Sequence, residues 1–335
     1  MSAKIEDFEE AFRVIKIDEN NYVGAHPLRL PMSIARGVYG GHICAQALLV
    51  GMESAPGYVP DSFHLYFIGA GSNKIPMSYK VTKVLDGDAY ASRLIEVVQD
   101  GQIKSNCMVT LRKKGILAQS RKSSRDKNLD DPSEVPHVPT KDEDPNKLHI
   151  VHHTDYIRNA YSDEFLDHEL VPHEKDQDPS DRWITVYSGI EQRKSFKDPL
   201  FNYVGIADLS DSALLTTLAR VMHFPWNPTE KYAPEEFDSN RDARTLLKVS
   251  FNILHIFHYN AMSLDHHIYF HSDDYTKAFD VCQDWLTFSY QVKRLSNHRS
   301  LVRGHLYNNE GTCVATVVQE GLAYLFSDVA NHLKL

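Results

Sequence analysis

An internal repeat is the feature of this sequence that most limits how the chain can fold. Residues 64–67 read HLYF, and residues 267–270 read HIYF. Further along, VVQDGQIKSNCMVTL at 97–111 has the same pattern as LYNNEGTCVATVVQEGL at 306–322. The matching segments occur in the same order in both halves of the 335 residues, which predicts two copies of one structural unit.

Each copy has the composition of β-strands joined by short turns. In the first copy SYKVTKV, SRLIEVVQD and IKSNCMVTLR are rich in β-branched residues, and LDGDA and QDGQ between them are typical of turns. The second copy has LTFSYQVKRL, SLVRGHLY and TCVATVVQEGLAYL, with NNEG as a turn. Strands joined by short turns pair antiparallel, so each copy predicts an antiparallel sheet.

One helix candidate precedes the strands of each copy. GGHICAQALLVGMESA at 40–55 is nearly all apolar and should be buried, and SDSALLTTLARVMHF at 210–224 opens with a Ser-Asp pair suited to an N-cap. A sheet wrapped around one central helix is the hotdog arrangement, an α+β architecture. We therefore predict an α+β double hotdog, with an N-terminal repeat at 1–112, a linker or insertion at 113–181 and a C-terminal repeat at 182–335.

The segment between the two copies changes character. It is basic at its start and then acidic, with four prolines in NLDDPSEVPHVPTKDEDPNK, which indicates a linker or a surface insertion. We expect irregular or helical surface structure at 150–180. RWITVYSGIEQR at 182–193 alternates well enough to be the first strand of the second copy.

Composition narrows the class of protein. The formal net charge of −9 argues against a nucleic-acid partner. No apolar run is long enough to predict a membrane span, and the acidic start lacks the apolar stretch of a signal peptide. Four scattered cysteines predict reduced thiols in an intracellular protein. The sequence ends Leu333-Lys334-Leu335, whose last two residues match the S-K-L peroxisomal address.

The stretch SLDHHIYFH at 263–271 suggests two kinds of site, a metal site and a hydrolase triad. His267 and His271 have the spacing by which one helix offers two ligands to zinc, and Ser263, Asp265 and His266 are the side chains of a hydrolase triad. The Ile, Tyr and Phe content predicts a strand instead, in which residues four apart lie roughly 13 Å from each other. We therefore expect no metal and no local triad, and interpret the histidines as structural.

Four segments carry a resemblance to a known family. They are GVYGGHICAQAL and SFHLYFIGAG in the first copy, and SLDHHIYFH and LVRGHLYNNEGTCVATVVQEG in the second. These segments resemble the type II acyl-CoA thioesterases, the bacterial and peroxisomal double-hotdog thioesterases, over about 36–112 and 184–325. The resemblance implies an enzyme without a cofactor that hydrolyses fatty acyl-CoA to free fatty acid and coenzyme A. It also implies that a water attacks without a covalent enzyme intermediate.

The same resemblance implies three catalytic residues. The glutamine is Gln319 in VVQEG, the hydroxyl residue is Ser263 in SLDHH, and the carboxylate is Asp211 in ADLSDSALL. Asp208 lies three residues before Asp211, so either could face the site, and the Ser-Asp order favours Asp211. His42 stands where bacterial members usually have glutamine, which puts the shape of the acyl pocket in doubt.

These residue types suit thioester hydrolysis. Asp211 can accept the proton of the water as a general base, and Ser263 and Gln319 can orient that water. Backbone amides near a helix N-terminus can stabilise the developing oxyanion. The phosphates of coenzyme A need basic contacts. Candidates for those contacts are Arg112, Lys113, Lys114, Arg121, Lys122, Arg299 and Arg303.

Two other functions remain open at this stage. One is a hotdog enoyl-CoA hydratase or dehydratase, which would use an aspartate with a histidine, such as Asp265 with His266 or His267. The other is a degenerate double hotdog that binds acyl-CoA without turnover. With the chain ending, the resemblance predicts the peroxisomal matrix, or otherwise the cytoplasm, and it allows a homodimer.

Overall fold

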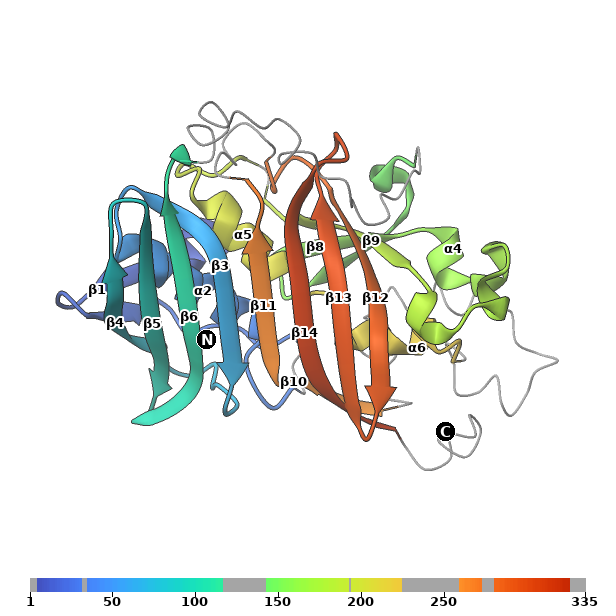
Figure 1. Ribbon diagram of the computed structural model, residues 1–335, viewed down its shortest axis with the longest axis horizontal. Helices are drawn as coiled ribbons and strands as arrows, with labels where there is room; N and C mark the ends of the chain where they lie inside the picture. Colours follow the sequence, from blue (N-terminus) through green and yellow to red (C-terminus); the bar gives the residue numbers. More distant parts are fainter. Residues whose placement is uncertain are drawn as a thin grey trace.

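The computed structural model describes residues 5–31, 35–116, 143–192, 194–224, 259–272 and 280–325. They form one 14-stranded sheet in which every neighbouring pair is antiparallel (Figure 1). The first half contributes, in sheet order, β1 (Val14–Lys16), β2 (Asn21–Gly24), β4 (Ser78–Asp86), β5 (Tyr90–Gln99), β6 (Gln102–Lys113) and β3 (Tyr58–Phe67). The second half continues with β11 (Asp265–Phe270), β14 (Cys313–Leu325), β13 (Arg299–Tyr307), β12 (Leu286–Ser296), β9 (Ile184–Ile190), β8 (Ile157–Tyr161) and β7 (His149–His153), while β10 (Tyr259–Ser263) pairs with β14.

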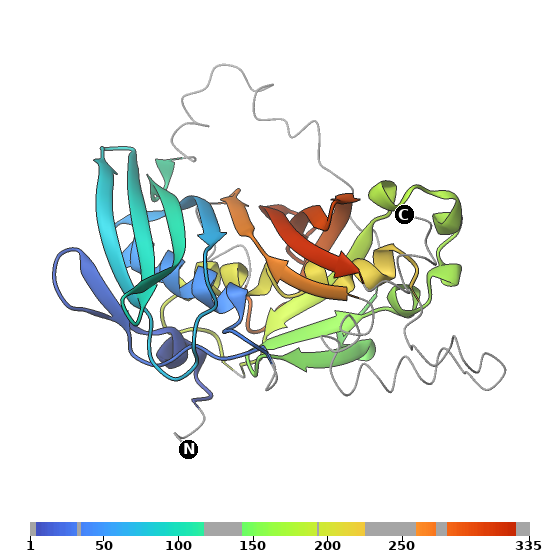
Figure 2. The same ribbon diagram turned by 90° about the horizontal axis from the view of Figure 1, so that it is seen from below.

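Two helices lie against the concave face of this sheet. The strands curve around α2 (Gly40–Glu53) and α5 (Phe201–Leu209), which pack against each other (Figures 1 and 2). The other helical elements are short: α1 (Phe8–Phe12), α4 (Asp163–Leu166), α6 (Leu218–Val221), η2 (Pro145–Lys147), η3 (His168–Leu170), η4 (Glu174–Asp176), η5 (Pro179–Asp181) and η6 (Leu215–Thr217). No helix among the described residues is both long and apolar enough to cross a bilayer.

The sequence prediction of the first central helix is confirmed, and that of the second is wrong. α2 occupies 40–53, as expected for 40–55. The second central helix, α5, covers 201–209, and the predicted 210–224 holds turns, η6 and α6. All nine residues of α5 are buried, so it lacks the amphipathic pattern that marks a helix. The Ser-Asp pair that suggested an N-cap follows the end of α5, where Ser210 donates its N–H to the carbonyl of Ile206.

The segment 150–180 also differs from expectation. Rather than wholly irregular or helical structure, it contains most of the hairpin β7–β8, which pairs through β8 onto β9. These strands are short and lie at the sheet edge, so their sequences carry little hydrophobic alternation. The strand expected within 182–193 is confirmed as β9 at Ile184–Ile190.

The two copies join through their central strands. β3 and β11 pair antiparallel, with His64 opposite His267, Leu65 opposite His266 and Phe63 opposite Ile268. A local two-fold axis therefore passes between the two histidines, and the repeated tetrapeptides lie side by side. This pairing makes one continuous sheet from two similar halves.

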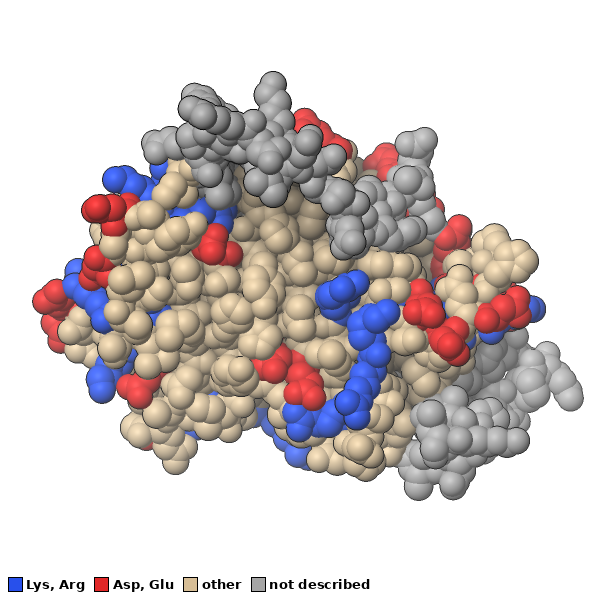
Figure 3. All heavy atoms as spheres, in the orientation of Figure 1, with Lys and Arg blue, Asp and Glu red and all other residues tan. Residues whose placement is uncertain are grey.

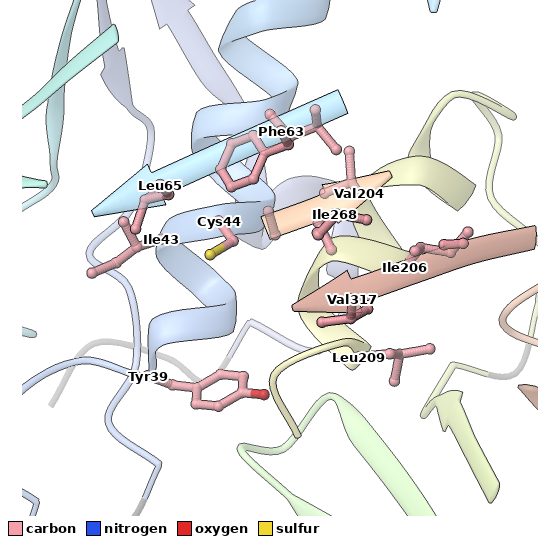
Figure 4. Packing of buried hydrophobic residues seen from close by; sticks show 14 of the residues in the cluster. Tyr39, Ile43, Cys44, Phe63, Leu65, Val204, Ile206, Leu209, Ile268 and Val317 are labelled. Atoms are coloured by element: carbon pink, nitrogen blue, oxygen red, sulfur yellow. The ribbon is translucent and has the colours of Figure 1, made fainter. Parts of the chain in front are cut away.

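The core lies between the helices and the inner face of the sheet. α2 and α5 turn aliphatic side chains toward the central strands, and burying each such side chain stabilises the fold by about 1.5–3 kcal/mol. Figure 4 shows Ile43 and Cys44 of α2 and Val204, Ile206 and Leu209 of α5 with Phe63, Leu65, Ile268 and Val317 of the sheet. The functional groups described next lie at one end of this contact.

Candidate active site

The structure brings Asp211, Ser263 and Gln319 together. The Nε2 of Gln319 donates to Asp211 Oδ1 at 2.8 Å and to Ser263 Oγ at 2.7 Å. Asp211 lies in the turn after α5, Ser263 ends β10, and Gln319 lies in β14. Three segments far apart in the sequence therefore meet at one amide group.

Strand register explains how Ser263 and Gln319 meet. β10 and β11 follow each other along the same partner, β14, with Ser263 opposite Gly321 and His267 opposite Val318. Leu264 separates the two strands and donates its N–H to the carbonyl of Glu320. Gln319 is fully buried, so its side chain points inward to the helices.

Asp211 lies at the N-terminus of the helix of the other repeat. The backbone N–H of Gly41 donates to its carboxylate, and the N-cap residue of α2, Tyr39, makes no side-chain capping bond. The approach is close, because a Cβ on Gly40 would lie 2.8 Å from Asp211 Oδ2. The positive end of a helix dipole favours a carboxylate here.

Burial nevertheless dominates the titration of Asp211. Only 8% of its side-chain surface is exposed. Burial raises the pKa of this carboxyl to about 7, the hydrogen bonds from Gln319 and Gly41 act to lower it, and the charge of Asp208 raises it further. A carboxyl with a pKa near neutrality is suited to accept and return a proton at physiological pH.

The structure separates the two aspartates that the sequence left open. Asp208 is fully buried on α5, and its Oδ1 lies 2.7 Å from Nδ1 of His42 on α2. Because α5 ends at Leu209, Asp211 lies beyond the helix and Asp208 within it. The hydrogen bonds to Gln319 therefore involve Asp211, whereas Asp208 and His42 tie the two helices together.

The histidines of the opening motif differ from one another. The strand prediction is confirmed, with β11 at Asp265–Phe270. His267 lies on the outer face, where its Nδ1 is 3.0 Å from that of His64, and His271 contacts Thr316 through Nε2. Among the described residues, no group of three His, Cys, Asp or Glu side chains could hold a metal ion.

The motif predicted a structural role for His266, or a pairing with Asp265 in a hydratase. His266 is fully buried on the inner face, with Nε2 2.8 Å from Ser210 Oγ and Nδ1 4.0 Å from Asp211 Oδ1. Burial lowers the pKa of its ring to about 3. The alternation of β11 could have shown this, because His266 and His267 must point to opposite faces.

The basic candidates for phosphate contacts differ in their exposure and in the partners they already have. Arg112 is 1% exposed, forms an ion pair with Asp61, and donates to the carbonyls of Phe270 at 3.1 Å and Ser272 at 2.6 Å. Arg112 is thus committed to joining the repeats. Figure 3 shows Lys and Arg side chains gathered over β12 and β13, beside a largely uncharged surface over β6, β3 and β11. The exposed basic residues of these two strands are Lys293, Arg294, Arg299 and Arg303.

The other basic candidates fall into three groups. Arg299 is paired with Glu320. Lys113 is exposed at the end of β6, and Lys114 follows it. Arg121 and Lys122 lie outside the described residues, as do the last three residues of the chain.

Two family models match this chain. One is described as the acyl-CoA thioesterase N-terminal domain and matches residues 28–112. The other is described as the acyl-CoA thioesterase C-terminal domain and matches residues 132–323, more than half of the chain.

Curated relatives align over almost the whole length. Mouse acyl-coenzyme A thioesterase 8 is 25% identical, covering 94% of this chain and 88% of that protein. The peroxisomal acyl-coenzyme A thioester hydrolase 1 of Saccharomyces cerevisiae is 21% identical, covering 94% and 93%.

Solved structures share the fold. The acyl-CoA thioesterase II TesB2 of Mycobacterium marinum aligns with a TM-score of 0.62 at 19% identity, covering 95% of this chain and 97% of that one. A protein of unknown function with a hot dog fold from Alicyclobacillus acidocaldarius aligns with a TM-score of 0.62 at 12% identity, covering 96% and 98%. The predicted α+β double hotdog is confirmed.

Proposed function

The chain belongs to the acyl-CoA thioesterase family and hydrolyses the thioester bond of acyl-CoA, and we propose that Asp211, Ser263 and Gln319 perform this hydrolysis by activating one water molecule. One observation carries the proposal: the Gln319 amide bridges the carboxylate and the hydroxyl in a buried place beside the N-terminus of α2. We further propose that the acyl groups are those of fatty acids.

The geometry divides the roles among the three residues. Both amide hydrogens of Gln319 are used, one toward Asp211 and one toward Ser263, so Gln319 holds these two groups in place. Ser263 accepts from Gln319 through Oγ, which leaves its own proton to orient the water. Asp211 accepts its hydrogen bond from Gln319 through Oδ1, which leaves Oδ2 to take the proton of the water.

The reaction then runs in two steps. The water oxygen attacks the thioester carbonyl while its proton passes to Asp211, giving a tetrahedral intermediate with a negative oxygen. The positive end of the α2 dipole stabilises this charge. When the intermediate collapses, the carbon–sulfur bond breaks, the electron pair leaves with sulfur, and the proton held by Asp211 passes to the coenzyme A thiolate.

Release of free thiol tests the proposal. Purified protein is incubated with fatty acyl-CoAs of several chain lengths, and Ser263→Ala and Gln319→Ala are compared with the wild type. We expect each variant to lower kcat by about 10²–10³-fold on every chain length that turns over. Wild-type rates in both variants would refute these roles. A burst of free thiol equal to the enzyme concentration, ahead of the release of fatty acid, would show an acyl-enzyme and refute direct attack by water.

The hydratase alternative required Asp265 together with His266 or His267. His266 points to the inner face of the sheet. Asp265 and His267 do approach each other, at 3.5 Å, but both point to the outer face of the sheet. The family shows an acyl-CoA thioester hydrolase, so the hydratase and the non-catalytic binding protein are set aside.

We also propose that the protein works in peroxisomes. The support is a relative from Saccharomyces cerevisiae that is named peroxisomal acyl-coenzyme A thioester hydrolase 1. A fluorescent protein fused to the N-terminus of this chain should mark peroxisomes, whereas the fluorescent protein alone should be diffuse. A fusion as diffuse as the fluorescent protein alone would contradict the proposal.

A homodimer is our last proposal on function. The outer face of the central sheet exposes large apolar side chains, whereas such sheets are usually polar on the solvent side. Those residues are Tyr66, Leu94, Met108, Tyr269 and Leu301. Light scattering should give twice the chain mass for the wild type and the chain mass for Tyr269→Glu; a wild-type monomer would contradict the dimer.

A further inference from the structure

His266 lies next to the Gln319 amide, although neither the motif nor the proposed water activation assigns it a role. The register that pairs His267 with Val318 places His266 beside Gln319 on the neighbouring strand, and both side chains are fully buried on the inner face. Cross-strand neighbours of this kind have Cβ atoms about 5 Å apart. The ring of His266 therefore lies beside the side chain of Gln319 on the inner face of the sheet.

The two residues each have a buried polar atom that lacks a partner. Nδ1 of His266 and Oε1 of Gln319 make no hydrogen bond of normal geometry with any described residue. Gln319 nonetheless favours the protonated ring, since it acts to raise the pKa that burial lowers. A buried donor and a buried acceptor side by side are satisfied most simply by each other.

The acceptors around the ring of His266 indicate which nitrogen carries the proton. With a pKa of about 3 the ring is neutral at physiological pH and has one N–H. If that proton were on Nε2, the bare Nδ1 would face two acceptors, Gln319 Oε1 and Asp211 Oδ1. Ser210 Oγ lies 3.0 Å from the carbonyl oxygen of Ala207 and 2.8 Å from Nε2, and its single proton can be donated to either. When it is donated to Nε2, Nδ1 carries the ring proton and both orphaned atoms are satisfied.

We propose that His266 is a positioning residue whose Nδ1–H holds Gln319 Oε1, with the Ser210 hydroxyl turned from Ala207 to donate to Nε2. The amide NH₂ of Gln319 is then kept facing Asp211 and Ser263. This role rests on the proposed function, because it acts only through the glutamine.

The titration of Asp211 explains why such a residue is needed. An ionised Asp211 repels Oε1 and selects the observed amide orientation by itself. A protonated Asp211 can donate to Oε1, which makes a flipped amide acceptable. Because burial raises the pKa of Asp211 to about 7, both forms are populated near neutrality, and the aspartate alone cannot hold the amide. The N–H of His266 favours one orientation in both forms.

The test replaces His266 with the residue of the other repeat. Phe63 occupies the equivalent place on β3, opposite Val109, so a phenyl ring fits this fold. We expect His266→Phe to lower kcat by about 10- to 100-fold, the effect of one buried hydrogen bond left unsatisfied, with KM within about 2-fold. His266→Asn offers a side-chain N–H in a similar place and should recover most of the loss.

A pH profile adds a readout that a purely structural role would not move. Loss of the ring N–H and of the fixed amide raises the pKa of Asp211, so the acid limb of kcat should shift to higher pH in His266→Phe. Among the other groups that act on Asp211, Asp208 raises the pKa, while Tyr39 and Cys44 stay uncharged because burial raises their own pKa values. The Nδ1 of His42 contacts Asp208 rather than Asp211.

Controls separate this role from the rest of the site. His64→Phe, on the outer face, should leave kcat and the pH profile unchanged. Wild-type kcat in His266→Phe while Asp211→Asn is inactive would overturn the positioning role alone, as would a rescue variant no better than phenylalanine. Full activity of Asp211→Asn would overturn the proposed function and this role with it.

Discussion

The two repeats have equivalent central strands and differ at the positions around the candidate site. About the axis between His64 and His267, the residue equivalent to His266 is Phe63, and the residue equivalent to Gln319 is Val109, which pairs with Phe63. Where the second repeat buries an imidazole and an amide, the first buries a phenyl ring and an isopropyl group. A buried polar group lowers stability unless it is hydrogen-bonded. The second repeat therefore needs hydrogen bonds at these positions, whereas the first has an ordinary apolar core there.

The first repeat still contributes to the site. Its helix α2 presents Gly40 and Gly41 to Asp211, and its His42 holds Asp208. The second repeat supplies side chains, and the first supplies a helix N-terminus. The difference between the repeats is therefore a division of roles, and the following changes test it.

Removing the proposed base should have the largest effect. Asp211→Asn should lower kcat by about 10³-fold, because general-base catalysis and the charge at the site are lost together. Asp208→Asn is the matched control three residues away: it weakens the bond to His42 and should lower the melting temperature more than kcat. Steady-state thiol release and thermal unfolding measure both, and the reverse ranking of the two kcat values would reassign the base to Asp208.

Exchanging the equivalent strand residues of the two repeats should have the next largest effect. Gln319→Val gives the second repeat the residue of the first and should lower kcat by about 10²-fold, since Asp211 and Ser263 lose their common partner. Val109→Gln buries an amide without partners in the first repeat. It should cost about 1–3 kcal/mol of unfolding free energy in denaturant melts and create no second site. Activity gained by Val109→Gln in a Gln319→Val background would show that the repeats are interchangeable.

The pH dependence should follow Asp211. Because burial raises its pKa to about 7, kcat should rise with pH through neutrality and fall about tenfold per unit below pH 6. In the unfolded chain this carboxyl has a pKa of roughly 3.9, the ordinary value for aspartate. Between those two values the folded state binds more protons than the unfolded state, so the free energy of unfolding decreases as pH rises.

Asp211→Asn should remove this dependence and be more stable than the wild type at pH 8. Stability of the wild type that rises from pH 5 to 8 by an amount that disappears in Asp211→Asn would contradict the raised pKa. Denaturant melts at several pH values measure this, and Asp208→Asn is again the matched control.

The close approach of α2 should have the smallest effect. A Cβ at Gly40 would lie 2.8 Å from Asp211 Oδ2 and 3.0 Å from the Phe67 ring, so Gly40→Ala must shift the carboxylate. We expect kcat to fall by about 10-fold, as for a catalytic group displaced by a fraction of an ångström. Gly51→Ala on the same helix, 3.3 Å from Val109, should change stability without changing kcat. Equal kcat values in the two variants would remove α2 from the site.

The sequence revealed the fold through its repeat and its strands, and revealed less of the second helix. α2 and the central strands carry strong local patterns, so their places were predictable. α5 is buried on every side and contains Gly205, so its residues offer no periodic contrast, and the Ser-Asp pair after it looked like a beginning.

The candidate site divides in the same way. Family motifs indicated Asp211, Ser263 and Gln319, and the structure brings them together. The motifs did not distinguish Asp208 from Asp211, because residues three apart lie on the same face of a continuous helix. In the structure α5 ends between the two, so this rule does not apply to them. They also passed over His266, since its role depends on which residue lies beside it across the strands, which a single segment does not show.

The capping of α2 by Asp211 has a consequence for how the chain matures. The carboxylate and the helix end that receives it come from opposite halves of the polypeptide, so neither half alone can build the proposed catalytic centre. The onset of thiol release during refolding would therefore show when the two halves dock, which is the last step of assembly. It would not show when either half forms.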